Sequence, residues 1–92
     1  EYMFLPGPER IAKLLIQKYD KYAENGVLTL RTNRQTLANE SGFGIKTVNR
    51  AVKSLADGGY ITKNERCIVV THDQYLSLKR LIAMIIAPES ET

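Results

Sequence analysis

Two short helical patterns separated by only a few residues constrain this fold most strongly. The first covers residues 33–40, the second covers residues 44–57, and Gly42 lies between them. Glycine suits the left-handed backbone position that ends a helix. Two helices joined by so tight a turn must cross at a steep angle, and the small side chain of Ala38 lets them approach closely. The pattern therefore predicts a helix-turn-helix.

The second helix of this pair has two different faces. At 100° per residue its apolar side chains gather on one face, which holds Val48, Ala51, Val52 and Leu55. The opposite face holds Lys46, Asn49, Arg50 and Lys53, with Asp57 one turn later. We therefore expect the first face to pack on a core and the second to face outward.

A longer helical pattern precedes the pair. It runs from Pro8, a residue suited to the first helical position, to Tyr22, and Asn25-Gly26 stops it. Residues 27–32 alternate imperfectly and are expected to form a short strand.

Two β-prone runs and one further helix follow the pair. The runs "YITK" and "RCIVVT" predict a hairpin, and Thr71 or Asp73 then opens a helix with a broad apolar stripe. The whole order is typical of a winged helix-turn-helix. We therefore predict one α+β, mainly α domain over residues 1–92, with a three-helix core, a β-hairpin wing and an additional C-terminal helix.

Two local details stay open. The first helix of the pair can be capped by Asn33, or by Thr32 with Gln35 in capping-box spacing. The hairpin can turn in two residues at Asn64-Glu65. Favoured two-residue turns want glycine where Glu65 stands, so a wider loop is equally open.

The positive charge of the chain is concentrated in its middle. The net charge is +3, and residues 31–66 hold seven Lys or Arg against three acidic residues. A local basic excess is typical of a phosphate-binding surface, although a solvated face without a partner can have the same composition.

A winged helix-turn-helix places the second helix of the pair in the DNA major groove, with the wing beside it. Arg50 can donate two hydrogen bonds to guanine, Asn49 can pair with adenine, and Lys46 can reach a guanine or a phosphate. These three are the candidate base readers. The candidate phosphate ligands are polar groups on the same side of the fold: Arg34, Gln35, Thr47, Lys53, Lys63 and Arg66.

These residues also resemble a family. The segment "LTLRTNRQTLANESGFGIKTVNRAVKSLADGGYITKNERCIVVT", with "RIAKLL" upstream, is similar to the C-terminal DNA-binding domain of the Crp/Fnr transcription regulators. The match includes the family's T-V-x-R-x-x-x-x-L core at residues 47–55. Where the family often has Arg then Glu, this chain has Ile45 and Lys46, so its preferred DNA sequence should differ. Gly44 also replaces the usual hydroxyl N-cap.

The resemblance implies a bacterial regulator that binds double-stranded DNA in the cytoplasm as a homodimer, without a cofactor. It further implies an effector-sensing domain upstream of this chain. Residues 1–7 are then expected to be the tail of an upstream linker or helix, and residues 88–92 a disordered tail. A GntR-like or MarR-like regulator domain is the alternative within the same fold.

A different function remains open for the last helix. Its apolar stripe of Leu78, Ile82, Ile85 and Ile86 is broad enough to be the interface of a winged helix with another protein or with a second copy of itself. On the recognition face, Lys53 can pair with Asp57 four residues later and need not contact DNA at all.

Other residue types argue against further functions. The apolar run at residues 81–87 is too short to cross a bilayer, which takes about 20 residues. Cys67 is the one cysteine, has no internal disulfide partner, and is expected to be a small buried residue. His72 has few partners for a metal site, and no nucleophile with a base stands out, so we expect no enzymatic activity. The tyrosines at 19, 22, 60 and 75 are expected at the rim of the core.

Overall fold

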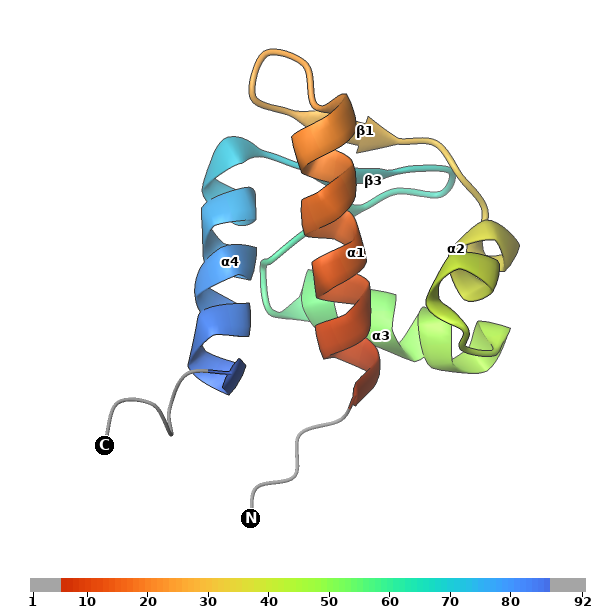
Figure 1. The fold of residues 1–92 in the computed structure, drawn as a ribbon. Helices are drawn as coiled ribbons and strands as arrows, with labels where there is room; N and C mark the ends of the chain where they lie inside the picture. Colours follow the sequence, from red (N-terminus) through yellow and green to blue (C-terminus); the bar gives the residue numbers. More distant parts are fainter. Residues whose placement is uncertain (1–5, 87–92) are drawn as a thin grey trace.

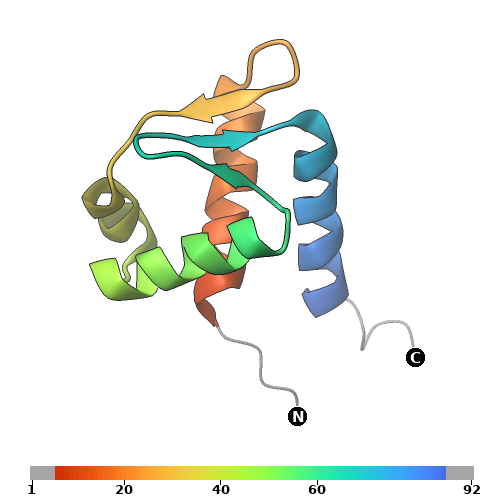
Figure 2. The same cartoon turned by 180° about the vertical axis from the view of Figure 1, so that it is seen from behind.

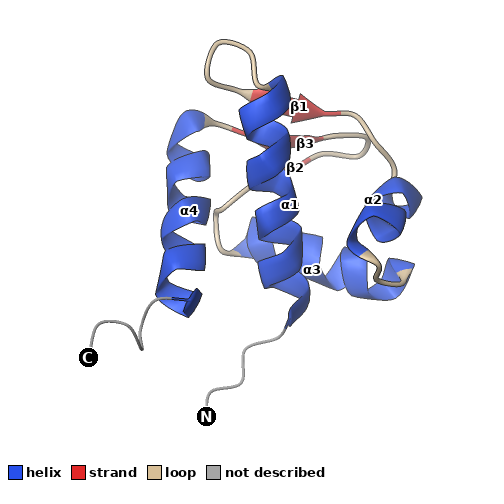
Figure 3. Cartoon of the chain, viewed as in Figure 1, coloured by secondary structure: helices blue, strands red, loops and turns tan. Residues whose placement is uncertain are grey.

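The computed structural model describes residues 6–86, in which four helices surround a small three-stranded antiparallel sheet (Figures 1 and 3). The elements in chain order are α1 (Pro6–Tyr22), β1 (Leu28–Leu30), α2 (Arg34–Ser41), α3 (Ile45–Asp57), β2 (Thr62–Lys63), β3 (Ile68–Val70) and α4 (His72–Ile86). This is the predicted winged helix-turn-helix, in which α2 and α3 form the helix pair and β2 and β3 form the wing.

The strand before the helix pair completes the sheet of the wing. β3 lies in the middle, with β1 on one side and β2 on the other, and both pairings are antiparallel. Leu28 is opposite Val70, and Lys63 is opposite Ile68. Because β1 continues directly toward α2, this sheet fixes the wing relative to the start of the helix pair (Figure 2).

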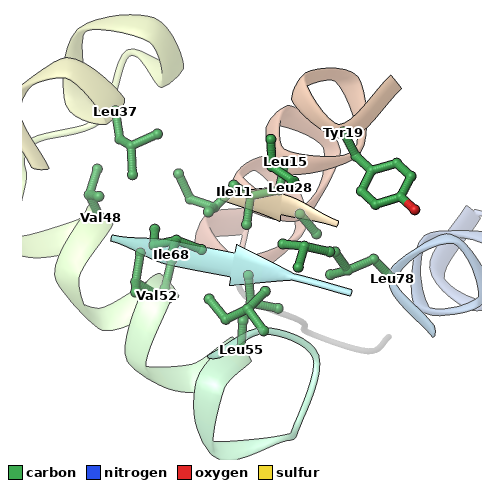
Figure 4. Packing of buried hydrophobic residues seen from close by; sticks show 14 of the residues in the cluster. Ile11, Leu15, Tyr19, Leu28, Leu37, Val48, Val52, Leu55, Ile68 and Leu78 are labelled. Atoms are coloured by element: carbon green, nitrogen blue, oxygen red, sulfur yellow. The ribbon is translucent and has the colours of Figure 1, made fainter. Parts of the chain in front are cut away.

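One apolar core joins the four helices with β1 and β3. α1 contributes Ile11 and Leu15, α3 contributes the four apolar residues of its inner face, and the sheet contributes Leu28, Ile68 and Val70, with Leu78 reaching in from α4 (Figure 4). Burying a side chain of this size stabilises the fold by about 1.5–3 kcal/mol. α1 packs against both α3 and α4, so it is the central support of the fold.

The tight turn between α2 and α3 has the expected chemistry. Asn33 is the N-cap of α2, since its side-chain oxygen accepts a hydrogen bond from the Thr36 amide at 2.8 Å. The alternative cap at Thr32 is therefore wrong. Gly42 follows α2 with a φ of 82° and donates its amide to the Ala38 carbonyl at 2.9 Å. A side chain is strained in that left-handed conformation, which explains the glycine.

The two strands of the wing are connected by residues 64–67, a wider loop than the two residues Asn64-Glu65. The Asn64 amide donates to the Cys67 carbonyl at 2.9 Å, so Glu65 and Arg66 lie at the tip of this loop, and the two-residue turn at Asn64-Glu65 is wrong. The physical reason is that the favoured two-residue turns require a positive φ. Among the described residues other than glycine only Asn25 has one.

The last helix begins with a reciprocal cap. The Gln74 amide donates to Thr71 Oγ1 at 3.2 Å, and the Thr71 amide donates to Gln74 Oε1 at 3.1 Å, so Thr71 rather than Asp73 opens α4. Gln74 also donates to the Gly59 carbonyl at 3.1 Å. Gln74 therefore connects α4 with the segment between α3 and β2.

The apolar stripe of α4 is partly internal. Leu78 is fully buried, Leu81 and Ile82 pack against the core, and Met84 is 68% exposed. The side chains of Ile85 and Ile86 lie outside what the structure describes.

Four of the expected features have a definite outcome in the structure. α1 begins at Pro6 rather than Pro8, so residues 6 and 7, expected in the tail of an upstream linker or helix, belong to α1, while residues 1–5 and the expected tail at 88–92 lie outside the described range. Tyr22 is 58% exposed, so its expected place at the core rim is wrong. Cys67 is only partly buried, because the residues around it form the open end of the wing. His72 is the first residue of α4 and is exposed, as a surface histidine should be.

Candidate nucleic-acid interface

The outer face of α3 carries a row of exposed polar side chains, while the opposite face of this helix is buried in the core. The four apolar residues of the inner face are each at most 2% exposed. Lys46, Asn49, Arg50 and Lys53 are all exposed. Burial of one face thus fixes the direction in which the other face points, and Figure 2 shows α3 crossing in front of α1, the helix against which it packs.

The first turn of α3 is open to an external ligand. Its N-cap, Gly44, makes no side-chain hydrogen bond to the helix. The first backbone amides of a helix have no partner within the helix, and the helix dipole gives that end partial positive charge. Thr47 is exposed on this turn, so hydroxyl and amide donors lie together there.

α1 holds the turn of the helix pair through Arg10, a residue to which the sequence analysis gave no role. Arg10 Nη1 donates to the Ser41 carbonyl at 3.1 Å, and its guanidinium lies 5.0 Å from the centroid of the Phe43 ring. Ser41 is only 6% exposed. No spacing rule in the sequence connects residue 10 with residues 41–43, so this contact could be found only in the tertiary structure.

Asn49 and Arg50, although adjacent in sequence, face different hollows. Asn49 lines an open hollow of about 530 Å³ between α3, the β1–α2 loop and the tip of the wing. Arg50 lines a smaller hollow of about 210 Å³ with Pro8 of α1 and Ser54 of α3. The two side chains therefore border different hollows, since consecutive residues of a helix point about 100° apart.

The structure brings some predicted phosphate ligands together and leaves others apart. Arg34 and Arg66 line the same hollow as Asn49, whereas Lys63 does not. Gln35 donates to Asn39 Oδ1 at 3.0 Å on the exposed side of α2. Lys53 Nζ is 2.9 Å from Asp57 Oδ2, as the alternative interpretation expected. With side chains 69% and 66% exposed, this ion pair is weak and a phosphate can displace it.

Arg31 was missed as a site residue. It lies in the loop between β1 and α2 and lines the hollow with Arg34 and Arg66. The signal for Arg31 in the sequence is the basic excess that begins at this residue, but the expected strand over residues 27–32 left it without a role. Within residues 6–86, none of these three guanidinium groups has a hydrogen bond or ion pair to another protein group.

No three His, Cys, Asp or Glu side chains of residues 6–86 lie close enough together to hold a metal ion. None of the described helices is both long and apolar enough to span a bilayer.

The geometry defines the class of protein. A supported helix pair, an outward cationic helix and a flanking wing make a winged helix-turn-helix domain. The family of Crp-like helix-turn-helix domains matches residues 9–78, most of the chain, and the protein belongs to this family. A search of curated proteins gives no match. The family is one of DNA-binding domains of transcription regulators and is generally non-enzymatic, which supports DNA binding by this chain in a transcription regulator.

Proposed function

We propose that this domain binds double-stranded DNA by placing α3 in the major groove, where Lys46 and Arg50 read base edges. The observation that carries the proposal is the exposed cationic face of a helix whose opposite face is fully buried. The major groove is about 12 Å wide and accepts one helix. Taking 100° per residue, Lys46 and Arg50 lie within about 30° of the middle of the exposed face, where the floor of the groove would be.

The phosphate contacts proposed around this helix come from three elements. Thr47 and the first amides of α3 suit a phosphate at one edge of the groove. Gln35 at the start of α2, Lys53 on α3 and Lys63 on the wing are exposed and suit flanking phosphates. These contacts would position the domain without selecting a sequence.

The proposal includes the wider context that the family implies. We propose a cytoplasmic homodimer that reads two half-sites about one helical turn apart, with an effector-sensing domain elsewhere in the protein and no catalytic activity of its own. Sedimentation of this chain with a selected duplex tests whether two chains bind one duplex. Two chains per duplex support the homodimer, and one chain on a palindromic duplex contradicts it.

The protein-contact alternative is weakened by the packing of α4. Leu78, Leu81 and Ile82 face the core of the domain itself, which accounts for much of the stripe that motivated that alternative.

The test of the main proposal is selection of duplexes from a random pool, followed by fluorescence anisotropy on the selected sequence. The apparent affinity should fall steeply with salt, through release of counterions. Arg50→Ala should relax the preference at one base pair by about 1–3 kcal/mol. Arg50→Lys is the matched variant, because it keeps the charge and loses the planar pair of donors. If both variants keep the wild-type base preference, Arg50 does not read a base.

A further inference from the structure

The hollow beside Asn49 has the composition of an anion site. Arg31, Arg34 and Arg66 reach it from the β1–α2 loop, the start of α2 and the wing tip, and Glu65 is the one acidic residue in its lining. Three arginines that line one hollow, and that have no hydrogen bond or ion pair to another side chain within residues 6–86, are like charges near one another, so an anion in the hollow would lower their electrostatic energy. The hollow is open and about 530 Å³ in volume, which suits an extended ligand passing through rather than an enclosed small molecule.

The position of the hollow relative to α3 indicates which part of DNA would fill it. A helix with its side chains is about 10–12 Å across, nearly the width of the major groove, so the flanks of a docked helix face the groove walls. Those walls are the sugar-phosphate backbones. Asn49 lies about 70° from the middle of the exposed face of α3, on the flank toward the wing.

We infer that this hollow binds the sugar-phosphate backbone of one DNA strand, with Arg31, Arg34 and Arg66 as phosphate ligands, and that Asn49 contacts this backbone instead of an adenine. The inference rests on the proposed insertion of α3 into the major groove. It assigns a role to Arg31 and changes the role expected for Asn49.

Glu65 has the opposite role in the same site. A carboxylate at the rim of a phosphate site repels the backbone and limits the affinity for every DNA sequence equally. Removing its charge should therefore strengthen binding, which is an unusual direction for a substitution at a binding surface.

The experiment compares selected and scrambled duplexes across salt concentrations, with wild-type protein and four variants. Arg31→Gln should weaken binding to both duplexes alike, by up to about eightfold at 0.1 M salt, and should reduce the salt slope by about 0.9. Arg80→Gln is the matched control, because it removes the same charge from an exposed position on α4. It should leave the slope unchanged.

The other two variants test Asn49 and Glu65. Asn49→Ala should weaken both duplexes by the same factor and leave the base preference at every position as in the wild type. Glu65→Gln should strengthen both. A loss of preference confined to an A·T pair in Asn49→Ala, or a salt slope in Arg31→Gln equal to that of the wild type, overturns the inference while the proposed function stands. If the wild-type chain itself does not bind duplex DNA, both fall.

Discussion

Several polar groups of the α1–α4 side have partners within the protein, whereas most of the candidate DNA ligands on the α2–α3–wing side have none within residues 6–86. On the first side Tyr75 donates to Asp20, and its ring stacks on that of Tyr19 with centroids 4.0 Å apart. The Tyr19 hydroxyl donates to the Gly26 carbonyl at 2.8 Å, and Lys79 lies 5.1 Å from the centroid of the Tyr75 ring. On the second side Lys46, Asn49 and Arg50 make no side-chain hydrogen bond within residues 6–86, and neither do the three arginines of the hollow.

This difference separates a scaffold from a binding face. A polar group that is hydrogen-bonded within the fold contributes to stability, typically about 0.5–1.5 kcal/mol. An exposed charge without a partner adds little to stability and stays available to an external ligand. Substitutions on the two sides should therefore change different quantities, which the following variants test in order of expected effect.

Leu37→Ala should have the largest effect and should damage both sides. Leu37 is fully buried where α2 packs against α3, and removing it leaves a cavity. The free energy of unfolding should fall by about 2–5 kcal/mol, measured by urea denaturation. Leu76→Ala on α4, where the side chain is 38% exposed, is the control and should change it by less than about 1 kcal/mol. An equal loss of unfolding free energy in the two variants would show that Leu37 is not a core residue.

Arg10→Gln should have the next largest effect, because Arg10 is a cation whose partners lie in the turn of the helix pair. Loss of its hydrogen bond to the Ser41 carbonyl should cost about 1 kcal/mol of stability. Hydrogen exchange should become faster at the amides of Gly42 and Phe43. Unchanged exchange there would show that Arg10 does not hold the turn.

Tyr75→Phe should change stability in a pH-dependent way and leave DNA affinity unchanged. The hydrogen bond from Tyr75 to the Asp20 carboxylate raises the pKa of the phenol above its ordinary value, since the bond requires the proton. A raised pKa in the folded state stabilises the fold below the ordinary pKa of about 10, and this stability is lost as pH rises through the folded value.

Urea midpoints at pH 8 and pH 11 give the test. The urea midpoint of the wild type should be higher than that of Tyr75→Phe at pH 8, and the difference between the two midpoints should be smaller at pH 11. Tyr22→Phe is the control, because this exposed tyrosine donates no hydrogen bond within the described residues. A constant gap would mean that the bond to Asp20 is not what separates the two proteins.

Asp57→Asn should have the smallest effect on stability. It removes an exposed ion pair worth less than about 1 kcal/mol, and an acidic side chain at the C-terminal end of a helix is unfavourable in itself. It also frees Lys53 on the binding face, so affinity for all duplexes should rise slightly. Asp73→Asn in the first turn of α4 makes the same charge change on the α1–α4 side and should not raise the affinity for DNA.

Much of the fold could be predicted from local patterns. The helix pair, the glycine turn at Gly42 and the two faces of α3 depend on residues close together in sequence, and all were found as expected. The turn of the wing and the N-cap of α2 were open choices because the local residue types and spacings allowed two solutions in each case. Pairing of Lys63 with Ile68, and the Asn33 hydrogen bond, decided between them.

The site was only partly predictable. Periodicity identified the outward cations of α3, but it could not tell that Asn49 and Arg50 face separate hollows. It also gave no role to Arg31, whose partners in the hollow come from α2 and from a wing more than 30 residues away.

By itself the sequence determined which segments become helices, where they stop, and which face of each is apolar, because short-range sterics, capping and hydrophobic periodicity act over a few residues. Only the tertiary structure decided which cations stand together, since the packing of α1 against α3 and the pairing of β1 with the wing bring distant residues into one place. Charges on a surface have no local preference for one another, so their grouping follows from the core beneath them.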